Sequence, residues 1–153
     1  MILLYIQIKE EFSVNKKECI LSGCLYFSSN RFVRLLTKLA EDEFRITGLT
    51  PTYAFAVTVV NRYGKISSTE LSEYLQMAPS TITRFVDKLL TKNLVERTIE
   101  GKNSFISPTE KGRILQESID IAWTNLEKTV NDKLGKEEVK GLVSTLNCAS
   151  ERL

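Results

Sequence analysis

The sequence predicts a mainly α-helical protein with one small β-hairpin. Along most of its 153 residues, apolar side chains recur at three- and four-residue steps, the period of a helix with one buried face. Residues 94–107 are the exception, because there two β-branched runs flank Gly101-Lys102. A glycine at this place suits a tight hairpin turn, since glycine accepts a positive φ. We therefore expect a hairpin between two groups of helices.

The first group should begin with two long helices. The apolar spacing predicts one amphipathic helix over residues 15–45, ended by Gly48. Thr50-Pro51 has the pattern of an N-cap followed by proline at the first helical position, and it opens a helix that Gly64 ends. This second helix is apolar on most sides, so it is expected in the middle of the domain.

Two short helices joined by a turn should come next. Ser67-Ser-Thr-Glu70 has the spacing of a capping box, in which the first serine and the glutamate satisfy each other's backbone amides. It predicts a helix over residues 68–75, a turn at 76–78 and a second helix from Pro79 to about residue 93. Such a pair is a helix-turn-helix unit, whose second helix fits the DNA major groove. Its polar face carries Ser80, Thr81, Thr83, Arg84, Asp87 and Lys88.

The remaining elements complete a winged helix-turn-helix core with helices at both ends of the chain. An edge strand of one or two residues is expected at Ile66. Ser107-Pro108-Thr109-Glu110 is interpreted as a second capping box, with the proline at the first helical position. It should open a long helix that Gly135 ends, followed by a final helix over residues 136–153.

Composition argues against an enzyme and against a bound cofactor or metal. The chain has no histidine, so it lacks the usual general base and the usual nitrogen ligands of transition metals. It also contains neither a GxxxxGK phosphate loop nor a GxGxxG segment after a strand. Between Arg62 and Arg113 there are nine basic and six acidic residues, a mild positive excess that an ordinary solvated surface explains equally well.

The chain is expected to be a soluble cytoplasmic protein without a membrane partner. Its three cysteines are sparse and lack Cys-x-x-Cys spacing, which fits a reducing compartment. The apolar run of residues 1–8 is too short to span a bilayer and lacks the features of a signal peptide. We expect a packed N-terminal arm, and the alternative is extra residues from an early start codon.

Five segments in this order and spacing resemble the MarR family of bacterial transcriptional regulators, over nearly all of residues 18–150. They are Leu49-Thr-Pro51, Ile66–Leu75, Ser80–Leu89, Asn93-Leu-Val-Glu-Arg97 and Thr109-Glu-Lys-Gly112. The resemblance implies a single domain over residues 1–153 that forms a two-fold homodimer. In it, residues 15–48 and 113–153 would be dimerisation helices, and residues 49–112 would form the DNA-binding lobe. The implied partner is a pseudo-palindromic operator, and the implied activity is regulation, mostly repression, in response to a small molecule or an oxidant.

Specific DNA contacts can be assigned along the helix-turn-helix unit. We assign base-edge contacts to Ser80, Thr81, Thr83 and Arg84, because recognition helices enter the groove by their N-terminal ends. Phosphate contacts are assigned to Lys88, Ser68 and Thr69, and contacts from the hairpin to Lys102 and Asn103. The alternatives are that Arg84 is a surface arginine paired with Asp87 or with neighbours of Lys88, and that Ser68 serves only to cap the helix.

The hairpin departs from the pattern of the family. Glu100-Gly101-Lys102 stands where the family usually has Asp-x-Arg, and lysine keeps the charge of arginine but not its planar fork. The hairpin is also about three residues shorter than is common in the family. We therefore expect a shorter reach into the minor groove than is usual in the family, with Asn103 as a substitute contact.

Three residues are candidates for sensing. Cys24, expected early in the first helix, resembles the reactive cysteine of the peroxide-sensing branch of the family, and the alternative is a small buried apolar residue. Tyr26 and Tyr53 are candidate linings of a ligand pocket, and the alternative is that they belong to the core. The competing function for the whole chain is a winged-helix module for protein contacts or for low-specificity, architectural DNA binding.

Overall fold

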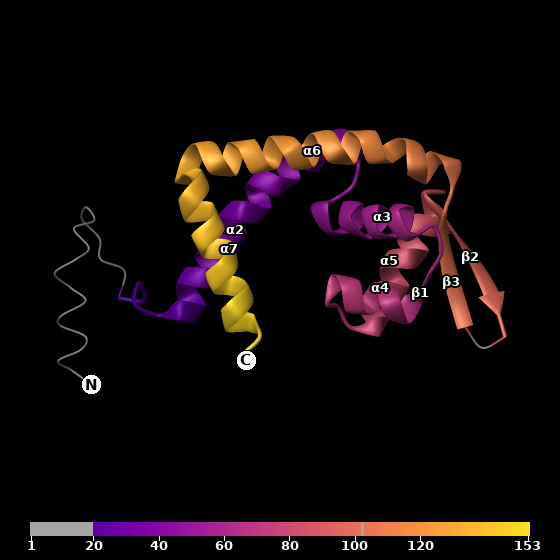
Figure 1. Ribbon diagram of the computed structural model, residues 1–153, viewed down its shortest axis with the longest axis horizontal. Coiled ribbons are helices and arrows are strands. Elements are labelled where there is room, and N and C mark those ends of the chain that lie inside the picture. Colours follow the sequence, from indigo (N-terminus) through magenta and orange to yellow (C-terminus); the bar gives the residue numbers. More distant parts are fainter. Residues whose placement is uncertain (1–19, 102) are drawn as a thin grey trace. The chain divides into compact units, whose positions relative to one another are not determined.

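The computed structural model describes residues 20–101 and 103–153. Its elements are α2 (Leu25–Phe44), the 3-10 turn η1 (Arg45–Thr47), α3 (Pro51–Tyr63), β1 (Ile66–Ser67), α4 (Ser68–Leu75), α5 (Pro79–Thr91), β2 (Val95–Glu100), β3 (Asn103–Pro108), α6 (Glu110–Leu134) and α7 (Lys136–Ser150) (Figure 1). The chain divides into two compact units, of which the first ends at Thr37. The predicted arm at residues 1–8 lies outside the described residues. Among the helices of the described part, none has the length and apolar composition needed to cross a membrane.

In the first unit, the predicted long helix begins later than expected. Residues 20–23 form a turn, in which the amide of Cys24 donates to the carbonyl of Leu21 at 2.9 Å. The carbonyl of Cys24 then accepts the first helical hydrogen bond, from the amide of Ser28 at 2.9 Å. The prediction of helix over residues 20–24 is therefore wrong, because Gly23 lies where a helix would lose backbone entropy for no packing gain. The part that concerns residues 15–19 lies outside the described residues.

The second unit contains the hydrophobic core, and α3 lies at its centre. Val57 and Val60 of α3 have no exposed surface, and neither do Leu71 of α4 and Ile82 of α5. In Figure 1, α3, α4 and α5 form a lobe beneath the N-terminal half of α6. The expected burial of α3 is confirmed, and Gly64 ends this helix as predicted.

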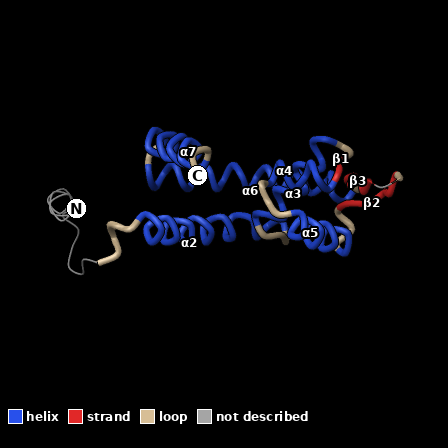
Figure 2. Tube along the Cα trace, turned by 90° about the horizontal axis from the view of Figure 1, so that it is seen from below, coloured by secondary structure: helices blue, strands red, loops and turns tan. Residues whose placement is uncertain are grey.

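A three-stranded antiparallel sheet, in the order β1-β3-β2, closes one side of this lobe (Figure 2). Glu100 pairs with Asn103, so the hairpin has a two-residue turn, and Gly101 adopts a φ of 63°. On the other edge of β3, Ile66 of β1 pairs with Ile106. The hairpin, its turn and the short strand at Ile66 are confirmed.

The start of α6 differs from the predicted capping box. Thr109 is the N-cap, its hydroxyl accepting a hydrogen bond from the amide of Gly112 at 3.1 Å, and Pro108 is the last residue of β3, paired with Val95. The fixed φ of proline suits the end of a strand as well as the start of a helix, so the sequence pattern did not separate the two. Gly112 meets the neighbouring loop so closely that an added Cβ would lie 2.1 Å from the carbonyl oxygen of Leu94.

Side-chain amides form a polar seam between α3 and α6. The amide nitrogen of Asn61 donates to the carbonyl of Gly112 and to the Oε1 atom of Gln116, both at 2.9 Å. Gln116 in turn donates to the hydroxyl of Thr58 at 3.2 Å and to the carboxylate of Asp120 at 2.8 Å. The seam, defined by Thr58, Asn61, Gln116 and Asp120, therefore fixes how α6 lies against the lobe.

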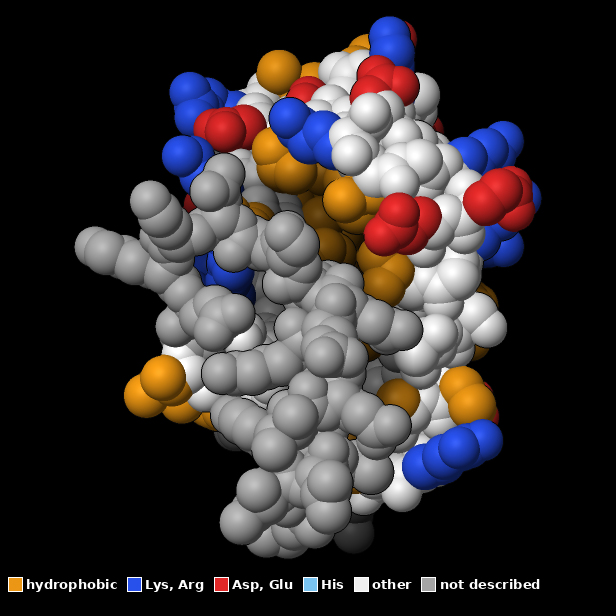
Figure 3. Space-filling view, turned by 90° about the vertical axis from the view of Figure 1, so that its left-hand side faces the viewer, with side chains coloured by type: hydrophobic (Ala, Val, Ile, Leu, Met, Phe, Trp, Pro, Cys, Tyr) orange, Lys and Arg blue, Asp and Glu red, His pale blue; other side chains and the backbone are white. Residues whose placement is uncertain are grey.

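The last helix, α7, buries none of its residues in the single chain. Its apolar side chains are nevertheless numerous, and Val143 and Leu146 are each 53% exposed. On α6, Ile121 and Trp123 are about half exposed. Figure 3 shows hydrophobic side chains that reach the surface between charged ones. An apolar surface of this kind on two successive helices is typical of a face that a partner covers.

Candidate nucleic-acid interface

The helix-turn-helix unit is held by local hydrogen bonds at each joint. Ser67 caps α4: its hydroxyl accepts from the amide of Glu70 at 3.2 Å, and the Glu70 carboxylate accepts from the Ser67 amide at 2.9 Å. The hydrogen bonds from Ser67 hold the pKa of Glu70 below its usual value. At the other end, Gln76 takes a φ of 52°, and Ser72 donates its hydroxyl to the carbonyl of Met77. These bonds confirm the predicted capping box and the predicted turn.

Ser67 is the N-cap residue of α4. Ser68 therefore does not cap this helix, and the alternative that assigned it a capping role is wrong. Ser68 is half-buried and Thr69 is exposed, both in the first turn of α4. Residues at the start of a helix present free backbone amides as well as their hydroxyls, a combination that suits phosphate oxygens. The assignment of phosphate contacts to these two residues stays a prediction.

Helix α5 divides into two faces as the sequence predicts. Ile82, Val86 and Leu89 are fully buried against the lobe. On the opposite side Ser80, Thr83, Arg84 and Lys88 are exposed, and Thr81 is half-buried. Thr83 turns its hydroxyl toward its own helix, donating to the carbonyl of Pro79 at 3.1 Å. A face of short hydroxyls and long cations can place donors against base edges and phosphates in a groove.

The proposed alternative for Arg84, an ion pair with Asp87, is wrong. The carboxylate of Asp87 instead accepts a hydrogen bond at 2.9 Å from the guanidinium of Arg97, on β2. Arg97 is the less exposed partner, with 30% of its side chain accessible. Among the ion pairs of the described residues, none involves Arg84, so no carboxylate of this part of the chain forms an ion pair with its guanidinium.

A second ion pair neutralises a carboxylate at the tip of the wing, the β2–β3 hairpin. The ammonium of Lys65 bonds to the carboxylate of Glu100 and also lies 4.7 Å from the ring centroid of Phe105. Lys65 therefore anchors both strands of the hairpin and compensates a charge that would repel phosphates. Lys102, the predicted wing contact, lies outside the described residues. Asn103 is exposed at the start of β3, beside the turn.

Sequence reasoning did not single out Arg97 or Lys65 as parts of the site. Both act through their partners: Arg97 joins α5 to β2, and Lys65 joins the loop before β1 to the wing. Opposite charge was the only sign in the sequence that these cations could form ion pairs. It did not identify their partners, because Asp87 and Glu100 are two of several carboxylates in the same region. Only the register of the hairpin decides which of them each cation reaches.

The candidate sensing residues fall in both units. Cys24 is a free, exposed thiol immediately before α2, and Tyr26 is 80% exposed in the first turn of that helix. The alternative of a buried apolar cysteine is therefore wrong for the single chain. Tyr53, in the second unit, stacks on Phe85 of α5 with ring centroids 4.3 Å apart. This contact supports the core interpretation of Tyr53, and it packs α3 against α5.

Comparison with known proteins relates the lobe to one family of DNA-binding proteins. The MarR family model matches residues 49–103. The HTH-type transcriptional repressor MdtR of Bacillus subtilis is 31% identical over 75 residues, which are 47% of this chain and 48% of that protein. The match thus spans about half the length of this curated relative.

Solved structures match the fold over most of the chain. A probable transcriptional regulator from Pseudomonas aeruginosa is 21% identical and superposes with a TM-score of 0.78, covering 84% of this chain and 98% of that one. The MepR–DNA complex of S. aureus is 16% identical with a TM-score of 0.75, over 86% of this chain and 100% of that one. The mainly helical fold with a small β-hairpin wing is thereby confirmed.

Proposed function

We propose that the chain is a member of the MarR family and a dimeric regulator that binds double-stranded DNA by sequence and represses transcription. The family model that matches residues 49–103 and the 31% identity to MdtR over 75 residues support this proposal. The protein acts in the cytoplasm and has no enzyme activity of its own. The proposal rests on the polar and basic character of the outer face of α5. There Ser80, Thr83, Arg84 and Lys88 are exposed, while the opposite face of the helix holds the lobe together.

Two structural features favour sequence reading over non-specific attachment. The guanidinium of Arg84 has no carboxylate partner in the described chain, so it is available for a bidentate contact to guanine. The Asp87–Arg97 ion pair fixes the wing relative to the helix, which limits how the lobe docks. The MepR structure, similar in fold, is a complex with DNA, and this supports the same use of the lobe here.

Dimerisation is the second part of the proposal. The exposed apolar residues of α6 and α7 give each chain a surface that a second copy can cover, in keeping with dimerisation helices over residues 15–48 and 113–153. A two-fold dimer places two α5 helices on half-sites about 34–36 Å apart, one turn of B-DNA. The operator is then a pseudo-palindrome.

The test is a titration of the purified protein into two labelled duplexes, read by fluorescence anisotropy at two salt concentrations. One duplex comes from the region upstream of the protein's own gene, and the other has the same composition in scrambled order. We expect the native duplex to bind about 10³-fold more tightly or better, also at the higher salt. Sedimentation of the free protein should show a dimer.

The other outcomes separate the competing functions. Equal, salt-sensitive binding to both duplexes would indicate low-specificity, architectural binding, because the phosphate backbone alone then provides the affinity. If a folded dimer binds neither duplex, the lobe is a protein-interaction module and the proposal is wrong.

Because Cys24 is a candidate sensing residue, an oxidant is the first effector that should be tested. Its thiol is free and exposed, and so is that of Cys148 on α7, which provides a matched control. We expect mild peroxide treatment to weaken binding to the native duplex at least tenfold, with the effect lost in Cys24→Ser and kept in Cys148→Ser. The same response in both variants would rule out Cys24 as the sensor.

A further inference from the structure

Two tyrosines form an exposed aromatic pair on the surface of the lobe. Tyr63 is the last residue of α3, and Tyr74 lies in the last turn of α4. Their ring centroids are 4.8 Å apart, and the ring planes are tilted by 33°. Tyr63 is 48% exposed and Tyr74 is 55% exposed, so the pair presents aromatic surface to solvent. Neither residue is assigned to DNA contact or to sensing.

The positions of the two rings are set by the structure around them. Gly64 ends α3 directly after Tyr63, and Leu71, three residues before Tyr74, is fully buried. A hydrogen bond with Tyr63 raises the pKa of Tyr74, so its hydroxyl stays protonated at neutral pH. A partner that docks here therefore meets a surface that is already ordered, which lowers the entropy cost of binding.

Two carboxylates flank the aromatic pair. Glu70 and Glu73 are exposed residues of α4, and after the hydrogen bond with Tyr63 their negative charges also contribute to the raised pKa of Tyr74. Among the ion pairs of residues 20–101 and 103–153, none involves either carboxylate. Glu70 is engaged with Ser67 in the capping box, so Glu73 is the carboxylate with free acceptor atoms.

An exposed ring beside a free carboxylate favours a guanidinium group. The face of an aromatic ring attracts a cation, and the planar guanidinium of arginine also stacks on the ring. Its N–H groups can at the same time donate to a carboxylate in a charge-assisted pair. Phosphates are repelled by the two carboxylates, so this surface is unsuited to DNA. Its charge instead complements a basic segment of a protein.

We propose that Tyr63, Glu70, Glu73 and Tyr74 form a docking patch for an arginine-bearing segment of another protein. In it, a guanidinium stacks on the ring of Tyr74 and donates to the carboxylate of Glu73. The patch uses none of the residues of α5 or of the wing that are assigned to DNA. A second protein can therefore be held by the lobe through a separate surface, and the site does not rest on the proposed function.

The test uses a blocked five-residue peptide of three glycines and two arginines as the probe. Two-dimensional NMR of the isotope-labelled, DNA-free full-length protein measures its affinity. One comparison peptide has lysine in place of arginine, with the same charge, and another has citrulline, with the same shape and no charge. We expect saturable binding of the arginine peptide that shifts the amide signals of Tyr63 and Tyr74. It should bind about threefold more tightly or better than the lysine peptide, and the citrulline peptide should bind weakest.

Variants of the patch separate its two parts. Tyr74→Ala and Glu73→Gln should each weaken binding of the arginine peptide about threefold or more, whereas Tyr74→Phe, which keeps the ring, should bind within about twofold of the unaltered protein. Glu96→Gln is the matched control, because it removes an exposed carboxylate from β2. It should bind the peptide as the unaltered protein does.

Three outcomes would overturn the proposal: no binding of the arginine peptide, equal binding by all variants, or equal affinity for the lysine peptide, which would indicate attraction of any cation. The helical circular dichroism of the variants should be unchanged. Because no DNA is present, a failure here leaves the proposed function standing. Conversely, a failure to bind either duplex leaves the peptide result unaffected.

Discussion

Replacing Gly112 by alanine should lower the free energy of unfolding by about 3 kcal/mol or more, a loss in the range of severe overpacking. The new methyl group would stand 2.1 Å from the carbonyl oxygen of Leu94, an atom of the backbone that cannot rotate away. Leu94 is itself buried, and its carbonyl accepts a hydrogen bond from the amide of Thr109. Relief therefore requires α6 to move away from the loop before β2, which breaks the cap of α6 and the packing beneath it.

Gly141→Ala is the control for this prediction. Gly141 lies in the middle of α7, where an added Cβ meets no atom within 4 Å. Alanine there should raise the free energy of unfolding by about 0.5–1 kcal/mol, because it costs less backbone entropy than glycine in a helix. Urea unfolding at a fixed protein concentration measures both variants. Equal stability of Gly112→Ala and the unaltered protein would show that α6 does not approach Leu94 as described.

Replacing Arg84 by alanine should weaken binding to the native duplex by about 1–3 kcal/mol, roughly 5- to 150-fold, and remove the preference for one base pair. The reason is that a guanidinium reads guanine by two parallel hydrogen bonds, which no other base pair accepts in the same geometry. The lobe should remain folded, since Arg84 is exposed and has no ion pair in the described chain.

Lys88→Ala distinguishes a base-specific contact from non-specific electrostatic attraction to the DNA backbone. Lys88 lies one turn further along the exposed face of α5, so its ammonium should reach a phosphate. Its loss should weaken binding to native and scrambled duplexes alike and reduce the slope of log K against log salt by about one. The binding constants of both variants for a set of duplexes with single base-pair changes separate these two effects. An unchanged base preference in Arg84→Ala would refute the assignment of Arg84.

Features governed by short-range chemistry were predictable from the sequence. The cap formed by Ser67 and Glu70, the turn at Gly101 and the breaks at Gly48, Gly64 and Gly135 each depend on a few adjacent residues, and each is present. The two-sided character of α5 follows from helical periodicity in the same way. These local features, in order, were enough to predict the architecture.

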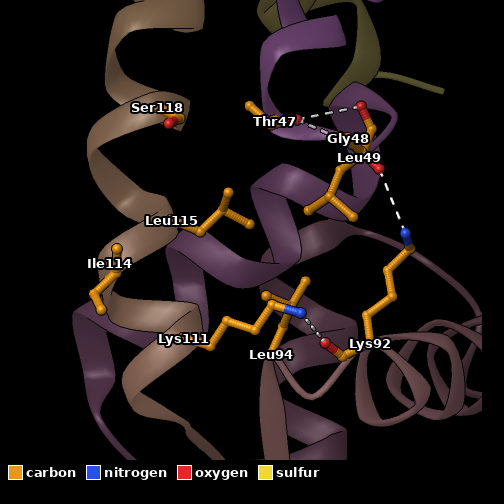
Figure 4. Close-up of a pocket in the computed structure, with 9 residues that line it drawn as sticks. All are labelled: Thr47, Gly48, Leu49, Lys92, Leu94, Lys111, Ile114, Leu115 and Ser118. Carbon is orange, nitrogen blue, oxygen red and sulfur yellow. Dashed lines mark hydrogen bonds between the residues drawn. The ribbon is translucent and has the colours of Figure 1, made fainter.

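Features that depend on pairing across the fold were not predictable. Pro108 fits the end of a strand or the start of a helix, and only its pairing with Val95 decides between them. Asp87 has Arg84 three residues earlier on the same helix, yet it pairs with Arg97 on a strand. A pocket lined by Lys92 and Lys111 (Figure 4) unites three segments spread over about seventy residues of sequence, a proximity that no local pattern encodes.

The polar seam between α3 and α6 restricts the kind of movement that the lobe can make. An apolar contact between two helices tolerates sliding, because one methyl group replaces another at little cost. The amide nitrogens of Asn61 and Gln116 have partners at fixed heights on the opposing helix, so a shift of one turn would leave these half-buried donors without partners. A displacement of this part of α6 is therefore transmitted as rotation of the lobe as a rigid body and not as shear within it. In a dimer, small changes in the angle between the two copies of α6 would then translate directly into the spacing of the two recognition helices.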